Sequence, residues 1–201
     1  MADFSQLPVY ANLVDRVHAL PSIGRKTADK IAYHIIEMSD QDVERLVQAI
    51  QDAHQRIHRC SVCGNYTDKD VCSICSDPSR DASTICVVTR PRDIIPFDKS
   101  RELNCKFHVL HGLLSPMEGI TPDMLTIDQL INRIKNGDVK EVIMATDPSV
   151  SGEATAMFIS KLIKPLGVRV TRLGYGISIG TDLQYADTMT ISRSIQYRNE
   201  L

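Results

Sequence analysis

Apolar residues recur at helical spacing through the first third of the chain. Residues three and four apart share one face of an α-helix, so this spacing predicts three helices. Their apolar positions are Leu13, Val14, Val17 and Leu20; Ala28, Ile31, Ala32, Ile35 and Ile36; and Val43, Leu46, Val47, Ile50, Ala53 and Ile57. Pro21 is expected to end the first helix, and Ser39 or Asp40 to cap the third.

Beyond residue 80, short apolar runs alternate with helical segments. The pattern predicts strands at 84–89, 107–111, 141–146 and 168–173, and helices at 93–99, 127–135, 151–164 and within 188–198. Thr126 and Gln129 have the spacing of a capping box for the helix at 127–135. Strands that alternate with helices in this order predict a parallel sheet covered by helices.

The segment 58–80 has neither the helical nor the strand spacing of apolar residues and is rich in Cys, Ser, Asp and Asn, so it cannot bury a core unaided. We therefore predict an α/β protein of four parts. These are an N-terminal helical hairpin domain at 1–57, a small four-cysteine module at 58–80, a parallel sheet with flanking helices at 81–175 and a short C-terminal segment at 176–201.

Composition narrows the class of protein. The 201 residues are 43% hydrophobic and 24% charged, typical of a globular domain with small attachments. No apolar run approaches the length of a membrane span, and the N-terminus lacks the pattern of a secretory signal, so we expect a cytoplasmic protein. The net charge of −2 neither supports nor excludes nucleic-acid binding, which needs only a local basic patch.

Four of the six cysteines form two C-x2-C pairs, Cys60 with Cys63 and Cys72 with Cys75. Each pair directs two thiolates toward one point, and two pairs complete the tetrahedron of a structural zinc site. Zinc-finger peptides gain about 10–16 kcal/mol from the metal, enough to fold a segment without an apolar core. We therefore predict structural Zn²⁺ in the module.

Two alternatives remain for the cysteines. The four thiols could be buried and metal-free, or His54 or His58 could replace one of them as a ligand. Cys86 and Cys105 fall in predicted strands and are interpreted as small core residues.

A turn rich in cations joins the first two predicted helices. The stretch L-P-S-I-G-R-K-T-A, at 20–28, contains Arg25 and Lys26, and Lys30 follows just beyond it. All three lie at the start of a helix, whose free N–H groups and positive dipole end suit a phosphate. It resembles the helix-hairpin-helix motif, although Ser22 stands where the motif usually has its first glycine. We predict DNA contacts that are independent of sequence and weaken with salt. An ordinary helical corner with solvated cations is the alternative.

The stretch I-M-A-T-D-P-S-V-S-G-E-A-T-A, with the strand before it, resembles the Toprim domain. Working Toprim enzymes use a glutamate after the first strand and an Asp-x-Asp pair after a later one to hold Mg²⁺. Here the first strand ends at Thr89 and Arg90, where the glutamate is expected, and Asp147 and Ser149 occupy the paired positions. Only one of the three expected acids, Asp147, therefore remains. Glu153 adds a carboxylate one helical turn on, but two carboxylates beside Arg90 make a poor magnesium site, so we expect little or no metal binding. Asp147 could alternatively be only a turn or N-cap residue.

These features together resemble the RecR family of bacterial recombination mediators over essentially the whole chain. The stretches that carry the resemblance are L-P-S-I-G-R-K-T-A, C-S-V-C…C-S-I-C-S-D-P-S-R, H-V-L-H-G-L-L-S-P-M-E-G-I, E-V-I-M-A-T-D-P-S-V-S-G-E-A-T-A and G-V-R-V-T-R-L-G-Y-G-I-S-I-G-T-D-L-Q-Y-A-D-T-M-T-I-S-R-S-I.

The resemblance implies a non-enzymatic protein of DNA repair that works with RecO and RecF to load RecA onto gaps coated by single-strand-binding protein. It implies a homo-oligomer, dimer or tetramer, with the hairpin helices at one subunit interface. By position, Lys26 and Lys30 would contact single- or double-stranded DNA, with Arg25 a weaker candidate. Asp147 and Glu153 would remain from the Toprim site on a partner surface.

The sequence departs from the family pattern at several positions. Ser22 replaces a frequent glycine, Asp147 an asparagine and Ser151 a glutamate, and 173–176 read L-G-Y-G rather than A-H-G or A-Y-G. The change at Ser151 removes a carboxylate from the surface thought to meet RecO.

Two other functions compete with this interpretation. A Mg²⁺-dependent Toprim nuclease or primase would use Asp147 and Glu153, and Thr89 and Ser149 argue against it because they replace expected acids. A zinc-dependent adaptor without DNA contacts is the third.

Overall fold

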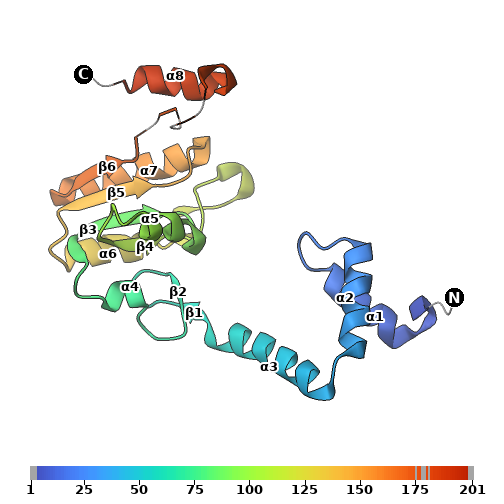
Figure 1. The fold of residues 1–201 in the computed structure, drawn as a ribbon. Helices are drawn as coiled ribbons and strands as arrows, with labels where there is room; N and C mark the ends of the chain where they lie inside the picture. Colours follow the sequence, from blue (N-terminus) through green and yellow to red (C-terminus); the bar gives the residue numbers. More distant parts are fainter. Residues whose placement is uncertain (1–3, 175, 178–179, 181, 199–201) are drawn as a thin grey trace. The chain divides into compact units, whose positions relative to one another are not determined.

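The computed structural model describes residues 4–174, 176–177, 180 and 182–198 (Figure 1). The chain divides into two compact units, Met1–Ile57 and His58–Leu201, and each is described by itself. None of the described helices combines the length and apolar character that a bilayer span requires.

The first unit is helical, as the apolar spacing predicts. Its elements are a 3-10 turn, η1 (Phe4–Gln6), and the helices α1 (Pro8–His18), α2 (Arg25–Glu37) and α3 (Asp40–Arg56). Helix α1 starts earlier than its apolar spacing suggests because Pro8 suits the first helical position, and it ends before the exposed Leu20. Ser39 caps α3 by accepting a hydrogen bond from the Asp42 amide, which confirms the first of the two predicted caps.

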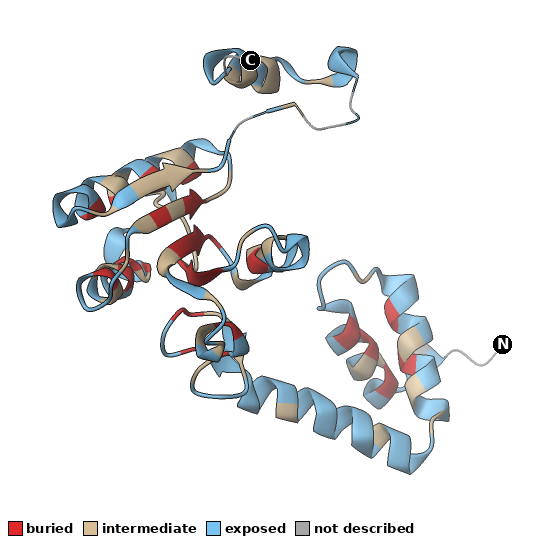
Figure 2. Ribbon diagram, turned by 60° about the vertical axis from the view of Figure 1, so that its left-hand side comes forward, coloured by how far each residue is buried: buried red, intermediate tan, exposed pale blue. Residues whose placement is uncertain are grey.

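Helices α1 and α2 pack together and enclose a small core (Figure 2). Its buried members are Tyr10, Val14, Val17, Ala28 and Ala32. Helix α3 differs, because none of its described residues is buried and most of it is exposed (Figure 2). Its exposed apolar residues include Leu46, Val47 and Ile50.

The second unit contains a two-stranded ribbon, a four-stranded sheet and flanking helices. The strands are β1 (His58–Arg59), β2 (Tyr66–Thr67), β3 (Asp81–Val88), β4 (Cys105–Val109), β5 (Glu141–Ala145) and β6 (Arg169–Arg172). The α-helices are α4 (Ser73–Ser76), α5 (Ile94–Ser100), α6 (Ile127–Lys135), α7 (Val150–Ile163) and α8 (Thr188–Gln196). Short 3-10 turns are η2 (Pro91–Asp93), η3 (Pro116–Glu118), η4 (Pro122–Met124), η5 (Lys164–Leu166) and η6 (Leu183–Tyr185).

The larger sheet is parallel throughout, in the order β4-β3-β5-β6, which confirms the predicted α/β class. The chain passes from β3 to one neighbour, β4, and later from β5 to β6 on the other side. Such a reversal of direction places the crevice between the carboxyl ends of β3 and β5, where open α/β sheets usually carry their sites. Val88 pairs with Ala145 in this register, so the residues that follow them meet at this edge.

Each face of the sheet is covered by different elements. One face packs on α6 and α7, through Leu130 and Ile134 from the first helix and Ile159 and Ile163 from the second. The opposite face packs on α5 and on the segment around α4. Three cysteines of that segment share this second core with buried sheet residues: Cys60, Cys63, Cys72, Cys86, Val88, Cys105, Phe107 and Val109.

Several sequence-based predictions differ from the structure. Strand β3 begins three residues before the predicted start, and β4 lies two residues before its predicted position. The capping box at α6 is wrong, because the Thr126 side chain makes no cap hydrogen bond. Its hydroxyl instead donates to the Val109 carbonyl at 2.6 Å and lies 3.1 Å from Nε2 of the buried His108. A long-range partner has replaced the local one.

Strand β4 is an edge strand whose outward backbone groups are nevertheless covered. Alternate residues of a strand direct these groups away from the sheet, where an unpaired edge invites association. Arg80 Nη1 donates to Cys105 O at 3.4 Å, Arg133 Nη1 donates to Phe107 O at 2.7 Å, and Val109 N donates to Cys63 O at 2.8 Å. The cysteine segment and α6 therefore close this side of the sheet.

Candidate functional site

The four cysteines of the two C-x2-C pairs converge on one point. Their sulfur atoms all lie within 4.8 Å of one another, and Cys63 Sγ is 3.5 Å from Cys72 Sγ. Four sulfurs bound tetrahedrally at zinc distances are separated by about 3.8 Å, so the cluster fits a zinc ion. The set closes without a histidine, which sets aside His54 and His58 as ligands. Cys86 and Cys105 lie in β3 and β4 as buried core residues, as predicted.

Backbone geometry shapes both cysteine turns. The Asn65 amide donates to Cys63 Sγ at 3.4 Å, and the Cys72 amide donates to Cys60 Sγ at 3.3 Å. Gly64, which lies between Cys63 and Asn65, has φ of +75°, where a side chain would be strained. Amide donors of this kind favour the ionised form of a thiol, which is the form that binds metal.

The thiols differ in their tendency to ionise. The pKa of Cys63 is raised, first by its hydrogen bond with Cys75 and then by burial. The pKa of Cys75 is lowered to about 6, mainly by the same hydrogen bond, and the Arg133 guanidinium lowers it further. Crowded thiolates repel one another, so a divalent cation at their centre is needed for all four to ionise together.

The acidic turn after β5 carries Asp147, which faces Arg90 at the end of β3. Arg90 Nη2 lies 3.5 Å from Asp147 Oδ2, and Arg90 also approaches Asp93 at 3.6 Å. The Arg90 side chain is 64% exposed and that of Asp147 40%, so the pair contributes at most about 1 kcal/mol to stability. The carboxylate at the position of a Toprim metal ligand therefore faces a guanidinium.

Asp147 is not the cap of α7. That position belongs to Ser149, whose hydroxyl accepts a hydrogen bond from the Gly152 amide at 3.1 Å. The turn is tight enough that a Cβ on Gly152 would meet the Asp147 carbonyl oxygen at 1.9 Å, so this position requires glycine. Ser149 therefore has a structural role at the place of an expected acid.

Thr89, at the place of the expected glutamate, follows directly after β3. It is buried, and its hydroxyl has no hydrogen-bond partner among the described residues. Neither residue that replaces a Toprim acid can act as a carboxylate ligand.

Glu153 pairs with Arg172 of β6. Its two carboxylate oxygens accept hydrogen bonds from the two Nη atoms of Arg172, each at 2.5 Å. The hydrogen bond from Arg172 is the main reason that the pKa of Glu153 is lowered, and Arg193 of α8 contributes in the same direction. Sequence reasoning missed Arg172, because the two partners lie 19 residues apart and no local pattern joins them.

A cavity of about 610 Å³ adjoins this ion pair. Its walls include Ser149 and Glu153 of the α7 start, Arg172 of β6, and Asp187 and Arg193 from the α8 region. Residues of the α8 region therefore line the cavity together with the start of α7 and the end of β6. Of the departures noted at 173–176, Tyr175 lies outside the described residues.

The hairpin of the first unit presents the predicted cations. Lys26 and Lys30 are exposed on α2, and Gly24 at the N-cap carries no side chain that could cap the first-turn amides. Arg25 instead donates to Asp15 of α1. Ser22 has φ of +66°, so it holds the conformation for which the motif usually uses glycine.

The parallel sheet, the four-cysteine zinc module and the helical hairpin together define a zinc-containing Toprim protein. Family models match in the same order: the RecR helix-hairpin-helix at 10–54, the RecR zinc finger domain of four cysteines at 57–77, the Toprim domain at 83–174 and the RecR C-terminal region at 176–199. These matches and the cysteine geometry confirm the prediction of structural zinc.

A curated relative covers nearly the whole chain. The recombination protein RecR of Natranaerobius thermophilus is 49% identical over 189 residues, which are 94% of this chain and 95% of the relative. This chain belongs to the RecR family.

Proposed function

We propose that this protein is a cytoplasmic, non-enzymatic recombination mediator that binds DNA independently of sequence. With RecO and RecF, it helps to load RecA onto gaps coated by single-strand-binding protein. The observation that carries the proposal is the 49% identity to a recombination protein over 94% of the chain. The pairing of Asp147 with Arg90 and of Glu153 with Arg172 supports a role in binding rather than in phosphoryl transfer.

DNA contacts are assigned to the start of α2. Lys26 and Lys30 lie one helical turn apart, beside first-turn amides without a side-chain cap, and Arg25 is partly neutralised by Asp15. Phosphate contacts from such a surface position a strand without reading its bases.

The double variant Lys26→Ala with Lys30→Ala tests the assignment. Loss of two phosphate contacts should weaken binding to single-stranded DNA and reduce the slope of log K against log salt by about 1.4. Fluorescence anisotropy with a labelled oligonucleotide at several salt concentrations measures both. Lys161→Ala with Lys164→Ala removes equal charge from exposed positions of the sheet unit and is the matched control. If both double variants bind like the parent, the hairpin is not the DNA site.

A nuclease assay addresses the enzymatic alternative. Incubation of the protein with labelled DNA and Mg²⁺ or Mn²⁺ should leave the DNA intact. Cleavage or synthesis that disappears in Asp147→Ala would contradict the mediator proposal and support a Toprim nuclease or primase.

Partner binding is proposed by resemblance. Ser151 lies in the first turn of α7, where family members often carry glutamate, and a carboxylate there would also suit the helix dipole. We therefore expect RecO to bind this protein less tightly than it binds relatives that have the glutamate.

A further inference from the structure

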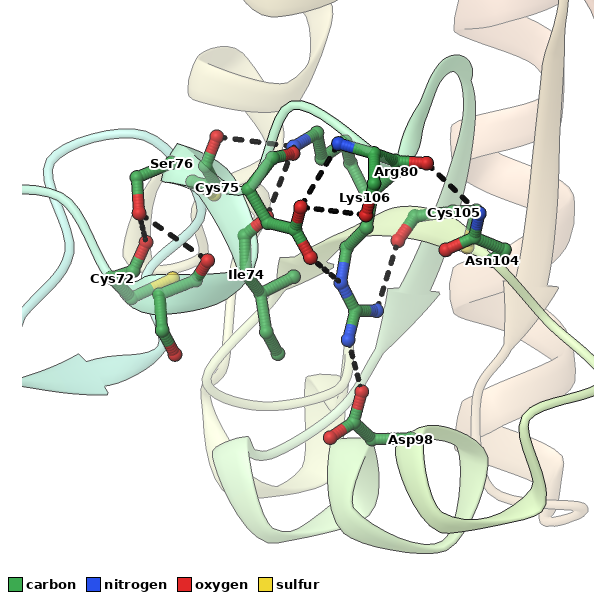
Figure 3. A network of polar contacts seen from close by, with 12 residues as sticks. Cys72, Ile74, Cys75, Ser76, Arg80, Asp98, Asn104, Cys105 and Lys106 are labelled. Carbon is green, nitrogen blue, oxygen red and sulfur yellow. Dashed lines mark hydrogen bonds and ion pairs between the residues drawn. The ribbon is translucent and has the colours of Figure 1, made fainter.

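Lys106 is a buried lysine of β4 whose side chain reaches into the zinc module. Only 7% of its surface is exposed. Its ammonium group donates to the carbonyls of Ile74 at 3.0 Å, Cys75 at 3.1 Å and Asp77 at 2.5 Å (Figure 3). An ammonium has three N–H donors, so these three carbonyls use its full capacity.

The three carbonyls belong to the second cysteine turn. Helix α4 is a single turn between Cys72 and Asp77, and its last carbonyls have no further turn to bond. Lys106 supplies those missing donors, and one of its acceptors is the carbonyl of Cys75, itself one of the four clustered cysteines. The backbone that carries this thiol is therefore held from the sheet.

Arg80 strengthens the same attachment. Its guanidinium approaches Asp77 at 3.6 Å and donates to Asp98 of α5 and to the carbonyl of Cys105 (Figure 3). Asn104 adds a bond from its side chain to the Ser79 carbonyl at 3.0 Å. The end of the module is thus fixed to both α5 and β4.

Charge adds a second reason for the position of Lys106. Burying an ammonium group is costly unless a negative group compensates it. Among the described residues no carboxylate lies within 4.0 Å of its nitrogen, and its hydrogen-bond partners are neutral carbonyls at a helix C-terminus. The Asp77 carboxylate, whose pKa is lowered mainly by hydrogen bonds from Ser79 and to a smaller extent by Lys106, lies beyond that distance. Zinc bound by four thiolates carries a net charge of about −2, so the loaded module adds to the compensation that the carbonyl dipoles and Asp77 supply.

We propose that Lys106 is a positioning residue of the zinc site: it fixes the backbone of the Cys72–Cys75 turn from the sheet and offsets the charge of the metal-bound thiolates. Zinc retention then depends on a residue outside the cysteine segment. The module and the sheet edge share one network rather than only an apolar contact.

Lys106→Met tests the proposal in the full-length, zinc-loaded protein. Competition with a chromophoric chelator should show about 10–100-fold weaker zinc binding, as for the loss of groups that orient metal ligands. Lys106→Gln keeps N–H donors without the charge and should give an intermediate loss. Lys140→Met removes an exposed lysine next to β5 and should leave zinc affinity unchanged.

Two further readouts separate positioning from general stabilisation. The absorption bands of the Co²⁺-substituted protein should change in Lys106→Met, and its melting temperature should fall more in the loaded than in the metal-free state. Parent-like zinc affinity in Lys106→Met would overturn the proposal. An equal loss of stability in both states would also overturn it. Should Lys106→Met fail to fold, parent-like affinity in Lys106→Gln has the same force.

Discussion

Ser22 shows that one residue can retain the geometry of a motif while departing from its composition. The hairpin turn needs a positive φ, and serine adopts it at +66°. A residue with a Cβ is strained in this region by about 1–2 kcal/mol, whereas glycine is not. Lys26 and Lys30 remain exposed on α2, so the departure affects the stability of the turn rather than the exposure of these cations.

Ser22→Gly should therefore stabilise the first unit. Relief of strain exceeds the added entropy of an unfolded glycine, which leaves a gain of about 0.5–1 kcal/mol in the free energy of unfolding. Chemical denaturation measures it. Ser115→Gly is the control, because Ser115 has φ of −144° and glycine should only destabilise there. A loss of stability in Ser22→Gly would show that the turn is not strained.

His108 predicts how stability depends on pH. Burial lowers its pKa to about 4, and the nearby charges of Arg133 and His111 act in the same direction, although hydrogen bonding to Thr126 opposes them. The folded-state pKa lies below the ordinary value of 6.5, so the unfolded chain takes up the proton first. The stability from a neutral His108 is complete above pH 6.5 and is lost as pH falls toward 4, by at most about 3 kcal/mol.

Urea unfolding between about pH 7 and 4 tests this prediction. His108→Gln should reduce the slope of unfolding free energy against pH by up to one proton, about 1.4 kcal/mol per pH unit. His34→Gln, at an exposed histidine of α2, is the matched control. An unchanged slope in His108→Gln would assign the acid sensitivity elsewhere.

At the scale of elements, the zinc module acts as the outer layer of the sheet edge. The Cys63 carbonyl and Arg80 bind backbone groups of β4 that would otherwise face outward. The module has no apolar core of its own apart from the one it shares with the sheet. Both the folding of the module and the covering of β4 are therefore expected to depend on the metal.

Zinc chelation should accordingly affect more than the cysteine segment. We expect faster amide exchange across 58–80 and also at Val109, while β5 in the interior of the sheet remains protected. Hydrogen exchange read by mass spectrometry before and after chelation measures this. Fast exchange confined to 58–80, with β4 unchanged, would show that the edge is closed without the module.

The sequence predicted what local patterns encode and missed what distant residues decide. Helix α6 was predicted at its observed bounds because its apolar face repeats with a clear period. The zinc site was predictable because the spacing within each cysteine pair is itself the ligand geometry. Thr126 was misassigned since its partner, the Val109 carbonyl, becomes a neighbour only after β4 joins the sheet. The roles of Lys106 and Arg172 were not predicted for the same reason, because their partners are also distant in the sequence.

At the scale of the whole molecule, α3 is an amphipathic helix whose apolar side is uncovered in the described structure. Leu46, Val47 and Ile50 are 40%, 47% and 61% exposed. Exposed apolar stripes usually mark interaction surfaces. The family resemblance implies a subunit interface in the helical hairpin domain at 1–57, and we propose that a second copy of the chain covers α3.

The mass of the purified protein should therefore be two or four times that of one chain. Light scattering coupled to size exclusion measures it. Ile50→Glu should shift the population toward smaller species because the carboxylate would be buried without a partner. Gln41→Glu introduces the same charge on the opposite side of α3 and should leave the mass unaltered. A single-chain mass in the parent would refute the assembly.

The contact between Arg90 and Asp147 also determines how the carboxyl end of the sheet responds to its surroundings. A site whose charge is balanced by a bound divalent ion changes its electrostatics when the concentration of that ion falls. The Arg90 guanidinium is covalently part of the chain and does not dissociate. The positive charge beside Asp147 therefore does not depend on divalent ions, and dialysis against ion-free buffer leaves it in place.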